Sequence, residues 1–289
     1  MKLTKNSDIN LAGVMGFPII HSRSPLMHNT MMTENKIRGA YVPLEIKPGT
    51  LKLALEALPK LGFKGVNLTI PLKQEAISVV DELDPVGRLI GAVSCVVVRE
   101  DDSLFGVNND WIGFRDNLDD AYPDWRSETH NAMVIGAGGG SRAIVYALIE
   151  AGIEQIYLVN RTQGHAKSIA AIFKDHHVNI YPWEDLNDLV PKADLIINTT
   201  NQGMVGQPAL PISLETAQPS TFVTDIIYTP LETPLIQAAK TRGLRTLGGL
   251  GMLLHQSRPA WRMWFGIDPV ITEKMRHLMT QDILNELGS

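Results

Sequence analysis

Short apolar segments alternate with amphipathic segments along almost the whole chain. The apolar segments, rich in valine and isoleucine, predict strands, and the stretches between them, with apolar positions three and four residues apart, predict helices. Such alternation is typical of an α/β protein with mostly parallel sheets. The predicted strands cover residues 11–17, 40–46, 65–70, 92–99 and 104–107 in the first part of the chain, and 132–135, 156–159, 195–198, 223–227 and 245–247 in the second.

Helix signals divide the chain into two domains. Ser24 and Pro25 provide an N-cap and a first helical position, and further helices are expected over about 48–61, from Pro71, and over about 110–120. The last of these would connect a first domain, residues 1–110, to a second domain, residues 111–250. The tail, about 251–289, is predicted to be helical and to return to the first domain.

Composition and charge narrow the classes of partner. Of the 289 residues, 44% are hydrophobic and 20% are charged, as in ordinary globular proteins, and no apolar segment is long enough to span a membrane. The net charge of −5, without a basic stripe, argues against nucleic acid. Residues 1–10 are polar and predict no signal peptide. With one cysteine, Cys95, and no metal-binding spacing among the histidines, neither a disulfide nor a metal site is predicted, and a cytoplasmic location is expected.

A glycine-rich loop lies between a predicted strand and a predicted helix. Its residues are Gly136, Ala137, Gly138, Gly139, Gly140 and Ser141, a GxGxxG-like pattern with serine in the third position. Glycines let the backbone turn tightly and approach a pyrophosphate, and the N-terminus of the following helix offers unpaired N–H groups to its charge. Since a second predicted strand follows the helix, the loop predicts a dinucleotide-binding site.

The end of that second strand indicates which dinucleotide is bound. Units that bind NAD usually carry an acidic residue there, whereas this chain has Asn160, Arg161 and Thr162. An arginine and a hydroxyl suit the 2′-phosphate of NADP, so NADP is favoured and NAD is the alternative. If Arg161 is an ordinary surface residue, this argument for NADP fails.

Polar side chains follow three strands of the first domain, in residues 21–25, 67–73 and 108–110. The carboxyl edge of a sheet is where α/β proteins bind ligands. Lys73 and Asp110 could form an acid–base dyad for the proton that accompanies hydride transfer. The ordinary alternatives are a solvated lysine in a first helical turn and an aspartate that caps a turn.

Taken in order, these segments resemble the shikimate/quinate dehydrogenase family over nearly the full length of the chain. The matching motifs are GxPIxHSxSPxxHN from Gly16 to Asn29, GxNxTIPxK from Gly65 to Lys73, GAV from Gly91 to Val93, NxDxxGF from Asn108 to Phe114, GAGGxSRA from Gly136 to Ala143, NRT from Asn160 to Thr162, NTTxxGM from Asn198 to Met204, DxxYxPxxTP from Asp225 to Pro234 and GLGMLxxQ from Gly249 to Gln256. The resemblance implies a substrate-binding first domain and a Rossmann-type NADP-binding second domain with a C-terminal helical return.

The resemblance also implies roles for individual residues. Lys73 would be the catalytic acid/base, paired with Asp110. Ser22 and Ser24, with Tyr228, would bind the substrate carboxylate. Asn67, Thr69, Ser94 and Gln256 would contact its hydroxyl groups. The cofactor-binding residues would be Gly136, Ala137, Gly138, Gly139, Gly140, Ser141, Asn160, Arg161, Thr162, Thr199, Met204, Gly249 and Met252.

Two departures from the family pattern fall beside the reacting hydroxyl or the catalytic aspartate. Ser94 stands where the family usually has asparagine, and Asn109 precedes Asp110 where it usually has threonine. Because a site built to hydrogen-bond a hydroxyl can strongly reject the wrong analogue, such changes can redirect specificity. A milder departure is His165, where many NADP-preferring members carry a second basic residue.

Three functions fit this pattern. The first is an NADP-dependent dehydrogenase that interconverts 3-dehydroshikimate and shikimate in aromatic amino acid biosynthesis. The second is the same chemistry on quinate or an amino-substituted analogue. The third is a non-catalytic NADP-binding regulator, which the presence of both Lys73 and Asp110 disfavours. The expected partner is a small carboxylate substrate, and the expected state is a monomer or a homodimer.

Overall fold

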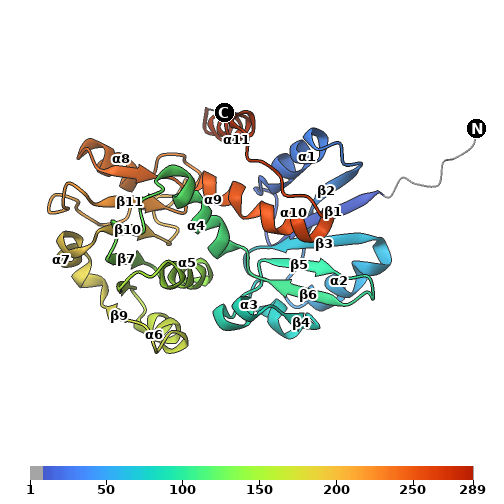
Figure 1. The fold of residues 1–289 in the computed structure, drawn as a ribbon, viewed down its shortest axis with the longest axis horizontal. Helices are drawn as coiled ribbons and strands as arrows, with labels where there is room; N and C mark the ends of the chain where they lie inside the picture. The colour runs from blue at the N-terminus through green and yellow to red at the C-terminus, as the bar shows by residue number, and fades with distance from the viewer. Residues whose placement is uncertain (1–8, 289) are drawn as a thin grey trace, which may run out of the picture. The chain divides into compact units, whose positions relative to one another are not determined.

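The computed structural model describes residues 9–288, in which the chain folds into two compact units. One contains the residues up to Asn109 together with Ser257–Met279, and the other contains Asp110–Gln256 and the residues from Thr280 onward. Each has a six-stranded sheet with helices packed on it (Figure 1), which confirms the predicted α/β class. Residues 1–8, most of the segment predicted to lack a signal peptide, lie outside the described range. Within that range, no helix is both long and apolar enough to cross a membrane.

The sheet of the first unit is mixed, with strand order β2-β1-β3-β5-β6-β4. β1 pairs in parallel with β2 and β3, whereas β5 runs antiparallel to both β3 and β6. The start of β5 and the end of β6 therefore lie at the same edge as the carboxyl end of β3. The bounds are β1 Asn10–Gly16, β2 Gly39–Glu45, β3 Phe63–Leu68, β4 Glu82–Leu83, β5 Cys95–Val98 and β6 Leu104–Val107.

Two local helix predictions for this unit were wrong. The first helix starts at Ser24 itself, so Arg23 takes the N-cap position and no side chain caps the helix. No helix starts at Pro71, because the Lys73 carbonyl accepts a hydrogen bond from Val93 N–H at 2.8 Å instead of one from a following turn. The observed helices are α1 Ser24–Glu34, α2 Leu51–Ala57, α3 Pro85–Ile90, α10 Ser257–Phe265 and the first part of α11 Glu273–Gly288, with 3-10 helices at Pro59–Leu61 and Glu75–Ser78.

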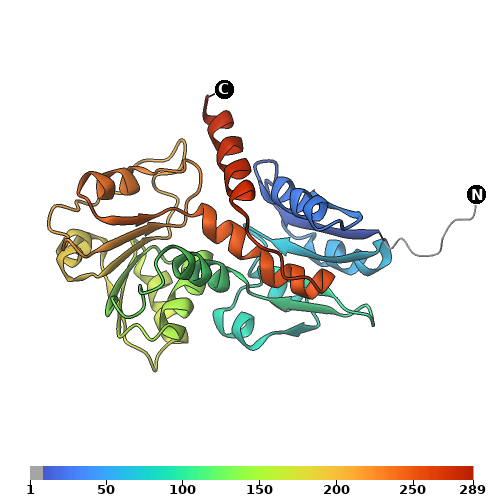
Figure 2. The same cartoon turned by 45° about the horizontal axis from the view of Figure 1, so that its top comes forward.

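The residues of β3 alternate between the two faces of the first sheet. Val66 and Leu68 belong to a buried cluster with Leu51 and Leu55 of α2. Gly65 and Asn67 point to the opposite face. A Cβ on Gly65 would lie 2.1 Å from Trp264 Nε1, so the glycine lets α10 lie directly against the strand. Figure 2 shows α10 lying across this sheet, with α1 beside β1 and β2.

The sheet of the second unit is parallel throughout, in the order β12-β11-β10-β7-β8-β9. The chain runs outward from β7 to β9 and then returns to β10 on the other side of β7, and such a switch point is where doubly wound sheets bind ligands. Its strands are β7 Asn131–Ile135, β8 Gln155–Val159, β9 Val178–Tyr181, β10 Leu195–Asn198, β11 Phe222–Asp225 and β12 Arg245–Leu247. Its helices are α4 Asp110–Ala121, α5 Gly139–Glu150, α6 Gln163–Ile172, α7 Leu186–Leu189, α8 Pro234–Thr241 and α9 Leu250–His255, with 3-10 helices at Trp183–Asp185 and Val190–Lys192.

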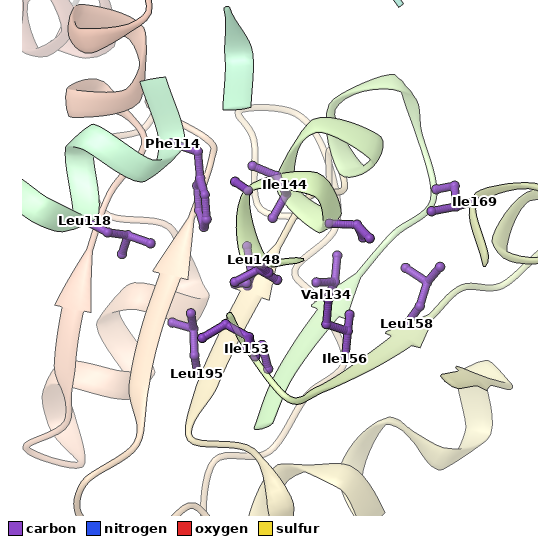
Figure 3. Packing of buried hydrophobic residues seen from close by; sticks show 14 of the residues in the cluster. Phe114, Leu118, Val134, Ile144, Leu148, Ile153, Ile156, Leu158, Ile169 and Leu195 are labelled. Carbon is purple, nitrogen blue, oxygen red and sulfur yellow. The ribbon is translucent and has the colours of Figure 1, made fainter. Parts of the chain in front are cut away.

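Both faces of this sheet are buried. Along β7, Val134 belongs to a cluster with α4, α5 and α6, and Met133 belongs to a second cluster with α7 and α8. Burial on both sides explains why the strand is a continuous apolar run in the sequence. Figure 3 shows the first cluster, in which Val134, Ile156 and Leu158 of the sheet face Phe114, Leu118, Ile144, Leu148 and Ile169 of the helices.

Candidate active site

Backbone segments from four strands meet at one edge of the first sheet. Thr69 N–H, after β3, donates to Met15 O of β1 at 2.9 Å. Leu68 N–H donates to Ser94 O, and Ser94 N–H donates to Val107 O of β6, both at 2.9 Å. These bonds bring the ends of β1, β3 and β6 and the start of β5 together. The polar residues predicted after these strands therefore share one edge.

Ser22 lies in the loop after β1, and Ser24 is the first residue of α1. Ser22 N–H donates to Ile19 O at 3.0 Å, and Ser24 N–H donates to Ser22 Oγ at 3.4 Å, so the two serines lie close together. Ser24 is buried, whereas Ser22 is partly exposed. Because Ser24 does not cap α1, its hydroxyl can serve other groups. The residues predicted to bind the carboxylate therefore lie side by side where the loop joins α1.

Asn67 lies near the end of β3 and is held by Tyr41. The Tyr41 hydroxyl donates to Asn67 Oδ1 at 2.8 Å, and Asn67 Nδ2 donates a longer bond to Ser94 O at 3.4 Å. Burial raises the pKa of the Tyr41 phenol well above its usual range, and the Cys95 thiol raises it further. The hydrogen bond with the Ser24 side chain acts in the opposite direction. The phenol therefore stays protonated and can donate.

Ser94 and Asn109, the two departures from the family pattern, are in direct contact. Ser94 Oγ accepts a hydrogen bond from Asn109 N–H at 2.7 Å, and both residues are buried. The Ser94 hydroxyl thus supports the backbone just before Asp110. Within residues 9–288, Asn109 Nδ2 is buried and has no hydrogen-bond partner. Because a buried amide N–H without an acceptor costs free energy, it is a donor that a ligand oxygen can satisfy.

The two predicted catalytic residues both follow strands of the first sheet. Lys73 comes after β3 and is partly buried. Asp110 comes shortly after the end of β6, is only 2% exposed, and is the first residue of α4 and of the second unit. A carboxylate in the first turn of a helix is stabilised by the unpaired N–H groups there.

In the second unit, α9 packs against the beginning of α4. A Cβ on Gly113 would lie 2.7 Å from both Met252 O and Gln256 Cβ, so the glycine allows this close approach. Gln256 occupies the C-cap position of α9. Since Gly113 lies one turn after Asp110, Gln256 and Asp110 occupy the same end of α4.

Tyr228 lies in the loop after β11, which a buried aspartate braces. Asp225 accepts hydrogen bonds from Asn198 Nδ2 at 3.1 Å, from Thr233 Oγ1 at 2.8 Å and from Ile227 N–H at 3.0 Å. Burial raises the pKa of Asp225, and these three hydrogen bonds oppose the rise. The sequence interpretation gave Asp225 and Thr233 no role. The DxxYxPxxTP spacing was the available signal, because an acid and a threonine at that separation can close a loop.

The glycine-rich loop follows β7 in the second sheet. Gly136 has a φ of 109°, and a Cβ there would lie 2.7 Å from Thr199 Oγ1. Ser141 Oγ donates to Gly136 O at 2.7 Å, so the serine in the third position braces the turn. Gly138 is the N-cap of α5, and a Cβ on Gly138 or Gly139 would meet no atom within 4 Å. Open space at a helix N-terminus fits an anionic group.

The other predicted cofactor residues of this edge lie in neighbouring loops. Thr199 N–H and Thr199 Oγ1 both donate to Ile135 O at 2.8 Å, which ties the loop after β10 to the end of β7. Met204 lies further along that loop and is exposed. Gly249 packs against the backbone after β11, and Met252 packs on the cluster that includes α4. Ala137 lies in the loop after β7, and Gly140 lies in the first turn of α5.

The segment after β8 carries the residues predicted to select NADP. Arg161 and Thr162 are exposed, and Asn160 Nδ2 donates to Thr162 O at 2.6 Å, which turns the segment into α6. Arg142 of α5 reaches α6, where its Nη2 donates to Ser168 Oγ at 3.5 Å. The sequence interpretation did not include Arg142. Its position directly after Ser141, in the first turn of α5, was the available signal.

Known proteins resemble the chain over nearly its whole length. Family models described as shikimate dehydrogenase substrate binding domain and as shikimate / quinate 5-dehydrogenase match residues 14–96 and 121–226. A shikimate dehydrogenase (NADP(+)) from Rhodospirillum rubrum is 45% identical, covering 92% of this chain and 95% of that enzyme.

Solved structures give the same result. A shikimate 5-dehydrogenase from Thermus thermophilus, in complex with NADP(H) and shikimate, has a TM-score of 0.84 at 32% identity and covers 95% of this chain and 99% of its own. A quinate dehydrogenase from Corynebacterium glutamicum, in complex with NAD, has a TM-score of 0.88 at 28% identity with the same coverage. The chain therefore belongs to the shikimate/quinate dehydrogenase family, as its ordered motifs predicted.

Proposed function

We propose that the protein is an NADP-dependent dehydrogenase that interconverts 3-dehydroshikimate and shikimate. One observation carries the proposal: polar side chains gather at one edge of the first sheet, where the ends of β1, β3 and β6 meet. Lys73 comes after β3, and Asp110 comes after β6. The hydroxyl and amide groups at this edge belong to Ser22, Ser24, Asn67 and Thr69. A row of hydroxyl and amide donors next to an acid–base pair suits a hydroxylated ring that carries a carboxylate. The similarity to shikimate dehydrogenases over nearly the whole chain supports the choice of shikimate.

The substrate is bound at two ends. Ser22 and Ser24 donate their hydroxyl groups to the carboxylate, and Tyr228 adds a third donor. Asn67, Thr69 and Gln256 bind the ring hydroxyls. On the side of the reacting hydroxyl, Ser94 and Asn109 supply a hydroxyl and an amide. The support for this side is the buried Asn109 Nδ2, which has no partner in residues 9–288.

Lys73 carries the proton. During reduction the Lys73 ammonium donates a proton to the ketone oxygen, and during oxidation the neutral amine accepts the proton of the hydroxyl. Asp110 stabilises the ammonium form and orients it. Bound NADPH supplies the hydride for reduction.

The cofactor-binding residues fit an NADP molecule. The open space at Gly138 and Gly139 accepts the pyrophosphate at the N-terminus of α5. Arg161 and Thr162 bind the 2′-phosphate, and Arg142 supplies a second positive charge from the neighbouring helix. With His165 in place of a second basic residue on α6, discrimination against NAD is weaker than in strict NADP enzymes.

The test is a panel of shikimate, quinate and amino-substituted analogues with NADP and NAD, followed by nicotinamide absorbance. We expect the highest kcat/KM with shikimate and NADP. Lys73→Ala should lower kcat by about a hundredfold or more, because a positioned acid/base contributes at least that much. Lys64→Ala, which removes an exposed lysine of β3, is the matched control and should leave kcat unchanged. A Lys73→Ala variant with near-wild-type turnover would contradict the mechanism.

A second candidate is the same chemistry with quinate or an amino-substituted analogue as the preferred substrate. The departures from the family pattern at Ser94 and Asn109 favour it, because they change the residues that stand beside the reacting hydroxyl. A quinate dehydrogenase among the similar structures shows that this fold accommodates such a substrate. A kcat/KM for quinate above that for shikimate would establish it. A Ser94→Asn variant with an unchanged substrate profile would remove Ser94 from the explanation.

A non-catalytic regulator would bind NADPH without turning over any acid of the panel. The same panel therefore decides this third candidate.

We also propose that the enzyme works in the cytoplasm as a monomer or a homodimer. The buried free thiol of Cys95 supports a reducing compartment. Light scattering of the purified protein would give the oligomeric state.

A further inference from the structure

Tyr41, which belongs to none of the matched motifs, holds a residue of the proposed substrate site. It lies on β2 and is 1% exposed. Its hydroxyl donates to Asn67 Oδ1 at 2.8 Å. Asn67 lies near the end of β3, so a phenol from β2 reaches the segment proposed to bind the ring hydroxyls.

The surroundings of Tyr41 hold its ring in one place. Asn29 brackets its backbone, because Asn29 Oδ1 accepts from Tyr41 N–H at 2.9 Å and Asn29 Nδ2 donates to Tyr41 O at 2.8 Å. The His28 ring stacks on the phenol, with centroids 4.0 Å apart and planes 6° apart. Trp261 Nε1 donates to His28 Nδ1 at 2.8 Å. Burial lowers the pKa of His28 to about 3, so the stacked ring stays neutral.

This arrangement decides which end of the Asn67 amide is presented to a ligand. An asparagine amide has an acceptor end and a donor end of nearly the same shape. Tyr41 occupies the acceptor, Oδ1, so the donor, Nδ2, is left with only the long bond to Ser94 O at 3.4 Å. Without the phenol hydroxyl, only the long bond to Ser94 O would distinguish the two orientations of the amide.

We propose that Tyr41 is a positioning residue for the substrate: its hydroxyl helps to fix Asn67 as a hydrogen-bond donor to a substrate hydroxyl. Tyr41 itself does not touch the substrate. This inference rests on the proposed function, because it takes Asn67 as a substrate-binding residue. It adds a determinant from β2, a strand that contributes no residue to the proposed site.

The first test is Tyr41→Phe, which keeps the ring and its stacking on His28 and removes only the hydroxyl. We expect kcat/KM to fall about threefold to tenfold, the equivalent of one neutral hydrogen bond. The fall should come from a higher KM, because the lost interaction holds the bound substrate before and during the reaction alike. The affinity for NADPH should not change. Tyr157→Phe is the matched control, since Tyr157 also donates to an asparagine, Asn131 Oδ1, at 3.0 Å, but in the second unit.

The second test asks whether Tyr41 acts through Asn67. Asn67→Ala removes the amide, and Tyr41→Phe is then added to it. If Tyr41 works by orienting Asn67, the double variant should have nearly the same kcat/KM as Asn67→Ala. If the two changes acted independently, the double variant would show the product of the two single fold-losses in kcat/KM.

The outcomes separate this inference from the proposed function. All variants are assayed with whichever acid of the panel the wild-type enzyme turns over best. If that acid is neither shikimate nor a close analogue, the proposed function fails while the Tyr41 comparison can still be made. Wild-type kinetics for Tyr41→Phe, an equal loss for Tyr157→Phe, multiplying losses in the double variant, or no effect of Asn67→Ala would each overturn the role of Tyr41.

Discussion

Replacing each of two glycines after β7 by alanine should have opposite effects on Tm and on the affinity for NADPH. At Gly136 the backbone has a φ of 109°, and a Cβ would lie 2.7 Å from Thr199 Oγ1. At Gly138 the φ is −86°, which any residue adopts, and a Cβ would meet nothing within 4 Å. Gly136 is therefore required by the fold, whereas only a bound ligand can require glycine at Gly138.

The expected magnitudes follow from these geometries. Gly136→Ala combines an unfavourable backbone conformation with a steric contact, and strain of this kind costs about 1–3 kcal/mol. In a chain of this size that lowers Tm by about 5 °C. Gly138→Ala should leave Tm of the cofactor-free protein within about 1 °C, because surface changes without contacts are nearly neutral. It should nevertheless weaken NADPH binding by about tenfold to a hundredfold, since the added methyl keeps the pyrophosphate away from the N-terminus of α5.

The assay measures both quantities on both variants. Thermal unfolding without cofactor gives Tm, and titration of the nicotinamide fluorescence gives the Kd of NADPH. Wild-type Kd for Gly138→Ala would show that the cofactor does not approach the loop at this glycine. An unchanged Tm for Gly136→Ala would show that the close contact with Thr199 does not constrain the turn.

The other predictions concern the cofactor phosphate, the buried carboxylate and the hydroxyl side of the site. Arg161→Ala should weaken NADPH by about tenfold and leave NADH unchanged, as measured by titration; an equal loss for both would place Arg161 elsewhere than at the 2′-phosphate. Because burial raises the pKa of Asp225, its contribution to stability is largest when the carboxyl is protonated and is lost as pH rises from the ordinary pKa of an aspartate through the raised pKa. The difference in unfolding free energy between wild type and Asp225→Ala should therefore narrow as pH rises above about 4 in urea titrations, and a widening would contradict the burial argument. Ser94→Asn combined with Asn109→Thr should retain more kcat/KM for shikimate than either single change; if the losses multiply, the two positions are independent.

Strands that are buried on both faces of a sheet could be predicted from the sequence. β7 lies between two helical layers, so its apolar residues form a continuous run that needs no partner information to be recognised. β4 and β9 were missed for the opposite reason. β4 is only Glu82–Leu83, and it is held beside β6 by Asp81, which accepts from Leu104 N–H at 2.7 Å through its side chain and donates to Leu104 O at 3.0 Å through its backbone. A strand defined by such a contact has no periodicity of its own.

The site divides in the same way. The positions of Lys73 and Ser22 after strands could be predicted from the sequence, because a polar residue directly after an apolar run is visible there, while their roles stay predictions. The contact of Tyr41 could not be predicted, since Tyr41 reaches Asn67 across the sheet from β2. No spacing rule relates residue 41 to residue 67.

The two departures beside Asp110 change their meaning once their contact is known. In the sequence, Ser94 and Asn109 are separate losses from the family pattern, and two losses on the hydroxyl side argue for a different substrate. In the structure the Ser94 hydroxyl supports the Asn109 backbone at 2.7 Å, and the Asn109 amide is the group with an unsatisfied buried donor. Compared with the family pattern, an amide and a hydroxyl have exchanged places between two touching residues. An amide and a hydroxyl are therefore both still present beside the reacting hydroxyl, on two residues in contact with each other. This favours a retained substrate over a new one.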